Sequence, residues 1–593
     1  MTVQSSPFRL PRITRTGIPE AAAEWLLGLK TIERLYEREG CGNHRYDEFL
    51  KLVLQIFQVD YKVLSGALDS IPATGPSVVV ANHPFGGIEG VALADLLLKV
   101  RPDVKVLTNE LLCRIPDLQE IFIGVDVLGN NSRKHNMSAI EEARKWVEDG
   151  HLLLIFPAGE VSSFDFSLLQ VTDPRWRNTA ARIVRKTEAS VTPIYIEGRN
   201  GLLFQTMGVI NQRLRTIRLI RELLNKKGET LGFRVGQTLD RSALKNMDSD
   251  SALTNYMRLN TYLLSTQKPE KVRPSLGRNK KIRNEKPVAA ATEMAKLVEN
   301  VQQLPEECLL LEKNEMAVYC ATAAQLPSVL REIGRLRELT FRGVGEGTGL
   351  ELDLDKYDEH YLHLFLWNRE KSEVVGAYRI GQIDKILREN GIHSIYSRSL
   401  FRYHAKFLHK LGSSLEMGRS FVRPEYQKSL GALMMLWKGI GAYVAANPWY
   451  RVLFGPVSIS SDYSEVSRQL MAGCLSMNNS DSVLTELVRP TTPLKKGRRR
   501  FWSQQDLQGL KDVDKLSLLV QQIEKDNKGI PVLLKQYLKL SGELAAFNVD
   551  PDFNNALDGL IIVDLTKVNE RALNKYMGAA GAKAFQDYNR PAA

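Results

Sequence analysis

The first group of residues that could do chemistry lies in residues 82–90. His83 is followed there by Gly86 and Gly87 and then by the carboxylate of Glu89. A histidine with an acid close by is suited to general base catalysis, because the acid fixes the tautomer and stabilises the imidazolium. The glycines allow backbone and substrate to approach closely. The same residues also fit a simple turn with a capping histidine, and the spacing alone favours neither interpretation.

A second group of charged residues lies between residues 353 and 419. Three aspartates are spaced at i, i+2 and i+5: Asp353, Asp355 and Asp358. By themselves they favour a polar loop, and a calcium loop is disfavoured because the glycine and closing glutamate of the EF-hand spacing are missing. One glutamate and two arginines follow: Arg379, Glu416 and Arg419. Glu416 and Arg419 fit either a functional pair or an internal ion pair.

The elements predicted around these residues are those of a layered α/β protein. Apolar runs predict strands at residues 78–81, 104–107, 121–123, 152–156, 190–196, 363–367, 373–380 and 451–456. Helical periodicity and capping residues predict helices over residues 17–39, 90–100, 138–149 and 425–447. Alternation of strands and helices favours α/β layers. His83 then follows a strand directly, and Glu416 precedes the long helix predicted over residues 425–447.

Three blocks in the first half resemble the glycerolipid and lysophospholipid acyltransferases. Asn82 and His83 followed by an acid are similar to that family's His-x4-Asp motif, and residues 156–162 are similar to its Phe-Pro-Glu-Gly-Thr-Arg-Ser block. Residues 191–194 resemble its later Val-x-Pro-Val block. The resemblance implies that His83 takes a proton from a substrate hydroxyl, whose oxygen then attacks an acyl thioester. It also implies a catalytic acid, Glu89, and substrate-binding residues: Asn82, Gly159 and Glu160.

This chain departs from the family pattern at two places. Glu89 lies one residue later than the family's aspartate and is one methylene longer, and Asp95 is a second candidate partner for His83. The family's phosphate-gripping arginine aligns with Val161, and its preceding glutamate with Ala158. An apolar residue cannot replace a bidentate guanidinium fork, so we do not expect a glycerol phosphate as acceptor.

The second half resembles N-acyltransferases of the GNAT-like superfold, in particular acyl-homoserine-lactone synthases and ornithine N-acyltransferases. Both groups have an acidic cluster, a Gly-x-x-Arg strand and a Glu-x-x-Arg strand in the order found here. Residues 455–460 resemble the Gly-x-x-Ser strand of the ornithine group, and residues 530–537 and 550–554 resemble its tail. The match spans residues 336–564 and favours the ornithine group, because the lactone synthases generally lack such a tail.

The resemblance assigns chemistry to the second group of residues. Glu416 would accept a proton from the attacking amine, directly or through water. Carboxylates are needed near the ammonium groups of a cationic amino acid, and three aspartates would supply them: Asp353, Asp355 and Asp358. Arg379 or Arg419 would hold the carboxylate of the amino acid.

Together the two halves resemble bacterial bifunctional ornithine-lipid synthases. The resemblance implies that the C-terminal domain transfers a 3-hydroxyacyl chain to the α-amine of ornithine, and that the N-terminal domain acylates the hydroxyl of the resulting lyso-ornithine lipid. An acyl carrier protein thioester, or acyl-CoA, would be the donor, with no bound cofactor and no metal. Glycine or lysine as the acceptor is one alternative. Others are a lysophospholipid acyltransferase with a non-catalytic partner domain, which Val161 disfavours, and a non-catalytic protein that binds anionic surfaces.

The net charge of +12 points to acidic partners. It lies in two basic runs, residues 268–286 and 489–500, while the remaining residues balance to zero. Anionic lipid headgroups and acyl carrier protein fit these runs. Nucleic acid does not, because no stacked aromatics accompany them. The alternative is solvated charge that keeps the segments extended.

The expected location is the cytoplasm, on the inner face of the cytoplasmic membrane. Residues 1–20 lack the apolar core of a signal peptide, and no apolar run approaches the roughly 20 residues of a spanning helix. Five scattered cysteines fit neither a zinc site nor a disulfide framework. The amphipathic residues 212–227 either lie on the membrane or pack on the core of their own domain.

The expected organisation is two α/β domains joined by a basic linker. Residues 1–266 form the lysophospholipid-acyltransferase-like domain and residues 291–593 the GNAT-like domain. Residues 267–290 combine proline, glycine and charge with few apolar side chains, which is typical of a linker.

Overall fold

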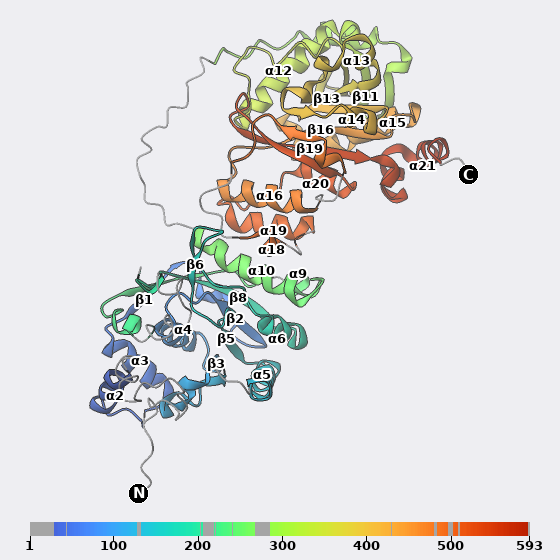
Figure 1. Cartoon of the computed structure of the whole chain (residues 1–593). Coiled ribbons are helices and arrows are strands. Elements are labelled where there is room, and N and C mark those ends of the chain that lie inside the picture. The colour runs from blue at the N-terminus through green and yellow to red at the C-terminus, as the bar shows by residue number, and fades with distance from the viewer. Residues whose placement is uncertain are drawn as a thin grey trace. The chain divides into compact units, whose positions relative to one another are not determined.

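The computed structural model describes most of the 593 residues. The described residues are 29–42, 44–126, 132–201, 203–205, 219, 221–239, 241–266, 285–428, 430–478, 483–495, 502–507, 510 and 512–590. The chain divides into two compact units, each described separately below (Figure 1). Unit 1 comprises Met1–Arg273 and Arg498–Lys515, and unit 2 comprises Pro274–Gly497 and Leu516–Ala593.

Residues 498–515 belong to unit 1, although the sequence analysis placed them in the second domain. The described part of this segment is anchored on α10 (Asp250–Leu263) by an ion pair between Arg258 Nη1 and Asp506 Oδ2 at 2.9 Å. The two residues are 248 positions apart, so no local pattern marks their contact. The unit boundary after Arg273 falls within the predicted linker, of which the structure describes residues 285–290.

Unit 1 is built on a seven-stranded sheet in the order β1-β9-β8-β2-β5-β3-β4. The strands are β1 (Asp60–Ser65), β2 (Ser77–Ala81), β3 (Val104–Asn109), β4 (Phe122–Val125), β5 (Leu152–Ile155), β8 (Ser190–Glu197) and β9 (Thr230–Val235). Every neighbouring pair is parallel except β8 with β9. All five residues of β2 are buried, which explains its continuous apolar sequence.

Eight α-helices of unit 1 are described through most of their length: α2 (Leu29–Arg38), α3 (Tyr46–Ile56), α4 (Ile88–Leu98), α5 (Ser132–Glu148), α6 (Thr179–Thr187), α9 (Arg241–Lys245), α10 and α18 (Gln504–Leu507). A short two-stranded ribbon joins β6 (Ser163–Asp165) to β7 (Gln170–Thr172). Helix α5 begins six residues before the predicted start at residue 138. Of the helix predicted over residues 17–39, the structure describes residues 29–39, and α2 lies within them.

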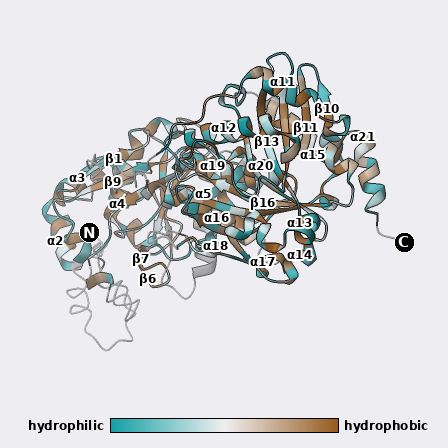
Figure 2. Cartoon of the chain, turned by 90° about the horizontal axis from the view of Figure 1, so that it is seen from above, coloured by the Kyte–Doolittle hydropathy of each residue, from teal (hydrophilic) through white to brown (hydrophobic). Residues whose placement is uncertain are grey.

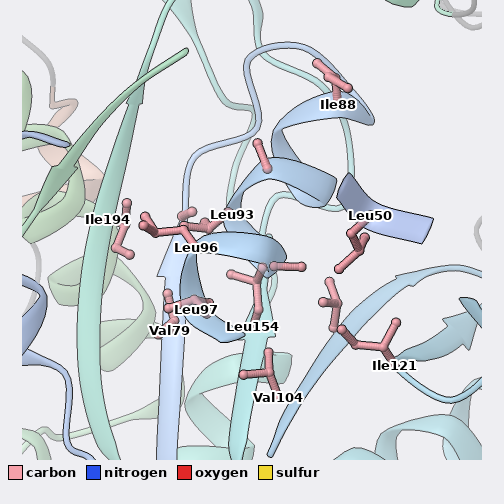
Figure 3. Close-up of a cluster of buried hydrophobic side chains, with 14 of the residues drawn as sticks. Leu50, Val79, Ile88, Leu93, Leu96, Leu97, Val104, Ile121, Leu154 and Ile194 are labelled. Atoms are coloured by element: carbon pink, nitrogen blue, oxygen red, sulfur yellow. The ribbon is translucent and has the colours of Figure 1, made fainter. Parts of the chain in front are cut away.

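Helix α4 is the centre of the unit 1 core. Its apolar side chains, among them Leu93, Leu96 and Leu97, lie against strand residues Val79 and Leu154 (Figure 3). Because α4 is apolar on all sides, it is buried on nearly all of them. The N-terminus of this helix is thereby fixed beside the end of β2.

Unit 2 is built on an eight-stranded sheet in the order β10-β11-β12-β13-β15-β16-β19-β18. The strands are β10 (Leu309–Lys313), β11 (Met316–Thr322), β12 (Leu362–Asn368), β13 (Glu373–Gln382), β15 (Ser414–Val422), β16 (Val452–Ile459), β18 (Glu543–Asp550) and β19 (Ala556–Asp564). All pairs are antiparallel except β15 with β16. The predicted strands at residues 363–367, 373–380 and 451–456 are confirmed.

Helices α12 (Pro327–Gly343) and α15 (Leu430–Ala446) cover opposite faces of this sheet. Phe365 of β12 belongs to the apolar cluster under α12, whereas a Cβ on Gly439 of α15 would lie 3.4 Å from Leu364 of the same strand. Successive strand residues point to opposite faces, so the two helices sandwich the sheet. Helix α15 confirms the long helix predicted over residues 425–447.

The remaining elements of unit 2 surround this sandwich. They are α11 (Met294–Gln302), α13 (Ile383–Glu389), α14 (Lys406–Leu411), α16 (Glu465–Asn478), α17 (Val483–Glu486), α20 (Val532–Lys539), α21 (Glu570–Tyr588) and a ribbon of β14 (Phe401–Tyr403) with β17 (Val488–Pro490), together with most of α19 (Val513–Ile523), whose first three residues belong to unit 1. Within the described residues, no helix is both long enough and apolar enough to span a bilayer. Helix α21, for example, mixes hydrophilic and hydrophobic residues along its length (Figure 2).

Candidate active sites

The loop after β2 holds His83 against a buried carboxylate. His83 Nδ1 lies 3.0 Å from Glu89 Oε1, and Glu89 is completely buried in the first turn of α4. Its Oε1 accepts hydrogen bonds from the N–H groups of Phe85 and Gly86, and its Oε2 accepts one from Gly87. The loop therefore wraps around the carboxylate at a helix N-terminus, where negative charge is favoured. The later position and greater length of Glu89 relative to the family's aspartate are compatible with its pairing to His83.

The pairing outweighs burial in setting both pKa values. Burial alone would raise the pKa of Glu89, but the charge of His83 and the amides of Gly86 and Gly87 lower it to about 2. Burial alone would lower the pKa of His83, but the charges of Glu89 and Asp173 raise it above its ordinary value. The imidazole is therefore a stronger base than a free histidine.

Asp95, the second candidate partner of His83, is engaged elsewhere. It accepts a hydrogen bond from the Tyr61 hydroxyl and forms an ion pair with Lys99 at 3.2 Å. His83 therefore has Glu89 as its carboxylate partner.

Asn82 lies beside this site but does not line it. Its Oδ1 accepts a hydrogen bond from Ile196 N at 2.7 Å, and its Nδ2 donates one to Ile196 O at 3.0 Å. These bonds tie the end of β2 to β8 and fix the strand from which His83 projects. The geometry gives Asn82 a positioning role in place of the substrate contact that the resemblance implied.

His83 opens onto a largely apolar cavity of about 630 Å³. Gly159 and Glu160, to which the resemblance gives a substrate-binding role, line the same cavity. Most of the wall is hydrocarbon from α2, α3, the sheet and the turn before β4, including Ile32, Leu35, Phe49, Val53, Val106, Leu118 and Phe122. An apolar cavity with one basic imidazole in its wall suits an acyl chain whose reacting end lies at His83.

Val161, which aligns with the family's phosphate-binding arginine, also lies in apolar surroundings in the structure. Val161 is buried, and a Cβ on Gly86 would lie 2.7 Å from its Cγ2. A cation that the sequence did not reveal, Arg177, lines the cavity next to Gly159. A Cβ on Gly159 would lie 3.4 Å from Arg177 Nε, and Gly159 has a φ of +66°. Arg177 belongs to no motif, because its position depends on the fold of the loop that precedes α6.

In unit 2, three donors converge on the carboxylate of Glu416. Its Oε1 accepts a hydrogen bond from Ser397 N at 2.7 Å, and its Oε2 accepts bonds from Tyr396 N at 3.1 Å and from the Tyr361 hydroxyl. Glu416 is 1% exposed. Burial and the adjacent charge of Glu416 raise the pKa of Tyr361 well above its ordinary value. Tyr361 is therefore a hydrogen-bond donor to Glu416 throughout the neutral pH range.

The three predicted aspartates are paired with three arginines. Arg337 of α12 contacts Asp353 at 3.2 Å and Asp358 at 2.8 Å. The other ion pairs are Arg379 with Asp355 at 2.6 Å and Asp358 at 3.3 Å, and Arg419 with Asp353 at 3.5 Å and Asp355 at 3.4 Å. Burial would raise the pKa of Asp358, but Arg337 and Arg379 hold it far below its usual range.

This network changes the role that the sequence assigned to the aspartates. The guanidinium groups already balance the negative charge of the aspartates. No net negative charge therefore remains there to bind the ammonium groups of a substrate. Arg337 was missed because it is a single arginine on a helix face between Ile333 and Phe341, with no motif around it. Its burial to 1% exposure is possible only because Asp353 and Asp358 approach from a later loop.

Arg379 retains donors for an anionic ligand. It is 1% exposed, and its Nε and Nη2 have no hydrogen-bond partner within the described part of the chain. The guanidinium stacks near the Tyr396 and Tyr361 rings, with its Cζ 4.9 and 5.2 Å from their centroids. Buried N–H groups without a partner are costly, and a carboxylate can satisfy two of them at once.

The regular pairing of β15 with β16 ends at Glu416, and Met417 O still lies against Gly455 of β16. The parallel pairing of the two strands consists of three residue pairs, the last being Glu416 with Phe454. On its other side β15 shifts register between Ala377 and Arg379 of β13, and Arg419 has a left-handed φ of 49°. The separated edge of β15 can pair with an extended, amide-bearing chain such as the arm of an acyl thioester. Arg419 thus projects from an irregular strand at the point where such a chain would reach Glu416.

Comparison with known proteins agrees with this geometry. Residues 21–268 match an acyltransferase family, and residues 336–438 match an acetyltransferase (GNAT) domain. A glycine N(alpha)-acyltransferase of Bacteroides thetaiotaomicron is 32% identical over 302 residues, which cover 48% of this chain and 86% of the relative. The corresponding protein of Phocaeicola vulgatus is 30% identical, covering 44% of this chain and 82% of the relative. This chain belongs to the family of these acyltransferases.

The chain is also similar to proteins that are named for a different activity. A lyso-glycine lipid O-acyltransferase of Phocaeicola vulgatus is 29% identical over 207 residues, covering 33% of this chain and 71% of the relative. The expected fold class is confirmed: an N-terminal α/β acyltransferase domain and a C-terminal GNAT-like α/β domain. The chain is an enzyme that transfers acyl groups from thioester donors, the donor class of both domain families.

The His83–Glu89 pair predicts a specific pH dependence of O-acyl transfer. The base must be neutral, so activity is lost as the pH falls through the pKa of His83, which lies above the ordinary value of about 6.5. Glu89→Gln removes the charge that raises this pKa, so the acidic limb of the kcat profile moves to lower pH. His83→Ala lowers the rate by about 10²- to 10⁴-fold. Thiol release from an acyl thioester in the presence of a hydroxyl acceptor measures both effects.

Asp95→Asn is the matched control, because Asp95 is a nearby buried carboxylate of the same helix with other partners. The acidic limb of the kcat profile of Asp95→Asn should coincide with that of the wild type. An unshifted limb in Glu89→Gln would contradict the pairing.

The arginine–aspartate network predicts a large stability effect at Arg337. Arg337→Met leaves two buried aspartates with fewer cations and should lower the free energy of unfolding of unit 2 by about 3–5 kcal/mol. Arg369→Met removes an exposed ion pair with Glu312 and should change the free energy of unfolding by less than about 1 kcal/mol. Denaturant unfolding monitored by tryptophan fluorescence compares the two, and equal effects would refute a structural role of the network.

Proposed function

We propose that this enzyme makes an amino-acid lipid in two steps and that ornithine is the amino acid. Unit 2 first transfers a 3-hydroxyacyl chain to the α-amine, and unit 1 then acylates the new hydroxyl. The observation that carries the proposal is that one chain is similar to two kinds of acyltransferase that are separate proteins in the relatives. Those relatives are named glycine N(alpha)-acyltransferase and lyso-glycine lipid O-acyltransferase, and both organisms have both proteins.

In the first step Glu416 accepts the proton that the attacking amine must lose. The nitrogen forms a bond to the thioester carbonyl carbon, and the thiol leaves. The free N–H groups of Arg379, with Arg419 beside it, hold the carboxylate of the amino acid. The amide-bearing arm of the donor lies along the separated edge of β15. Acyl carrier protein and coenzyme A share this arm, and acyl carrier protein is the donor we favour, because the basic chain suits an acidic partner.

In the second step His83 takes the proton of the 3-hydroxyl group while that oxygen attacks a second thioester. Glu89 stabilises the imidazolium that forms, and the apolar cavity holds an acyl chain. The lyso lipid carries a carboxylate and no phosphate. Arg177 at the cavity and the absence of a cation at Val161 suit that acceptor better than a glycerol phosphate.

Glycine is the second candidate acceptor, because the relatives of both kinds are named for glycine. The motif succession of residues 336–564, including the tail, supports ornithine instead. The three aspartates of the Arg337 network no longer support a cationic acceptor, because arginines neutralise them. The choice between the two therefore depends on other residues of unit 2.

The proposal includes action at the inner face of the cytoplasmic membrane. A lipid with a single acyl chain is held by a bilayer only marginally, and a tethered second domain raises the local concentration of its acceptor. Of the segments considered for membrane contact, the structure describes residues 219 and 221–227, residues 285–286 and residues 489–495. Leu219 and Leu223 line the cavity of unit 1, which supports packing of that segment on its own domain.

Lipid analysis of a bacterial host that lacks amino-acid lipids tests the proposal. Expression of the full chain should yield diacylated ornithine lipid, detected by mass spectrometry. His83→Ala should accumulate the singly acylated lyso form, because the second step requires the base. Glu416→Ala should yield neither lipid, because the amine is not activated.

Each other outcome has a definite meaning. Diacylated glycine lipid from the wild type would establish the second candidate. Normal diacylated lipid from both variants would refute the site assignments, and no amino-acid lipid from the wild type would refute the proposal.

The second step also predicts a role for Arg177. Arg177→Met keeps side-chain length but removes the charge, so KM for the lyso lipid should rise about 10- to 100-fold with little change in kcat, because the carboxylate is bound equally in ground and transition states. Arg175→Met, an exposed arginine two residues away, is the matched control and should leave KM unchanged. A kcat effect alone would contradict carboxylate binding.

A further inference from the structure

A row of polar side chains crosses three neighbouring strands of unit 2. Ser458 of β16 pairs with Asp558 of β19, and Asp558 pairs with Asn548 of β18. Directly paired residues lie on the same face of a sheet, and so does Asp550, two residues after Asn548. Glu346, from the loop after α12, joins the row because its Oε2 accepts a hydrogen bond from Ser458 Oγ at 3.1 Å.

Three of these residues form a buried acidic cluster: Glu346, Asp550 and Asp558. They are 7%, 5% and 6% exposed. In contrast to the aspartates of the Arg337 network, they form no ion pair with a described lysine or arginine. In addition, Asp558 Oδ2 has no hydrogen-bond partner within the described residues. A buried carboxylate without a partner is costly, so this oxygen points to a ligand that donates to it.

The electrostatics of the cluster agree with an unbalanced site. Burial, followed by the charges of Asp550 and Glu346, raises the pKa of Asp558 well above its ordinary value. Burial also raises the pKa of Glu346 and of Asp550. A cation placed among the three would lower all of these pKa values and relieve their mutual repulsion.

The acidic cluster adjoins the substrate-facing arginines. Phe553, in the turn between β18 and β19, lies under the Arg419 guanidinium, with a distance of 4.6 Å from Cζ to the ring centroid. Arg419 Nη1 also donates to the Tyr396 hydroxyl at 3.2 Å, so it connects the Glu416 region to the cluster. Ser458, at the edge of the row, is exposed and gives access from solvent.

The chemistry of the cluster selects the class of ligand. No group of three or more His, Cys, Asp or Glu residues in the described part of the chain has the arrangement to hold a metal ion. An alkylammonium group has three N–H donors and one positive charge, which suits three carboxylates that converge from separate elements.

We propose that Glu346, Asp550 and Asp558 bind the side-chain ammonium group of the amino acid acceptor. The inference rests on the proposed function and makes it more specific: the carboxylate of the acceptor is held by Arg379 and Arg419, and its second ammonium group by the acidic cluster. A diamino acid such as ornithine makes both contacts, whereas glycine makes only the first. The acidic cluster, and not the three aspartates of the Arg337 network, then determines which amino acid is used.

Acceptor competition with the purified full chain tests the inference. The acceptors are ornithine, glycine and norvaline, which has the ornithine carbon chain without its ammonium group. A site built around an N–H donor rejects the analogue that lacks it, so the wild type should prefer ornithine to norvaline by at least about 100-fold in kcat/KM. Asp558→Asn and Glu346→Gln should each lower this ratio at least about tenfold. Asp564→Asn, on the same strand but outside the cluster, should leave the ratio unchanged.

A ratio that stays the same in Asp558→Asn and Glu346→Gln would overturn the inference, even if ornithine is acylated. Folding is checked by the melting temperature, which should not fall in Asp558→Asn, because the substitution removes a repelling charge. A large fall would indicate a purely structural role for the cluster.

Ligand-dependent melting separates this inference from the proposed function. If the wild type acylates none of the three acceptors, the proposed function fails, but ornithine should still raise the melting temperature of the wild type and not that of Asp558→Asn. If ornithine raises neither melting temperature, or raises those of the wild type and Asp558→Asn equally, the ammonium site is refuted.

Discussion

Each candidate active site depends on a buried glutamate that is held by consecutive backbone N–H groups. The amides of Phe85, Gly86 and Gly87 bind Glu89, and those of Tyr396 and Ser397 bind Glu416. A buried carboxylate must be satisfied by several donors, so each loop can close in only a few ways around its glutamate. The loop conformation in turn sets where His83 and Tyr396 lie. The fixed position of one negative charge therefore organises each site before any substrate binds.

Unit 2 contains two groups of three carboxylates with opposite charge balance, and all of them but Asp355 are buried. Asp353, Asp355 and Asp358 are matched by three arginines, which makes that network a framework around the site. The acidic cluster of Glu346, Asp550 and Asp558 forms no ion pair within the described residues. Buried charge without a partner is costly to keep, and such cost is characteristic of places where a ligand supplies the missing charge. Counting acids along the sequence cannot distinguish the two groups, because the distinction lies in their partners.

The sequence predicted the elements that have strong local signals. The apolar strands around His83, the long helix α15 and the common strand of Glu416 and Arg419 all follow from periodicity or motif order. Arg337, Arg177 and Glu346 could not be found in this way, since each acquires its role from residues distant in the chain. The same reason explains why the role of Asn82 was wrongly predicted. Its motif position suggested substrate contact, but its side-chain amide forms hydrogen bonds with the backbone of Ile196. The packing of residues 498–515 with unit 1 likewise depends on a pairing between distant residues, Arg258 and Asp506.

In the proposed two-step reaction, both active sites bind the same carboxylate. The amino acid presents it to Arg379 and Arg419 in the first step, and the lyso lipid still carries it to Arg177 in the second. A glycerol phosphate acceptor would instead require a fork of donors where this chain has the buried Val161. Because both active sites recognise the same carboxylate, the second step is restricted to products of the first step. The side-chain ammonium group needs to be recognised only in the first step, by the acidic cluster. An acceptor that the cluster rejects never becomes a lyso lipid.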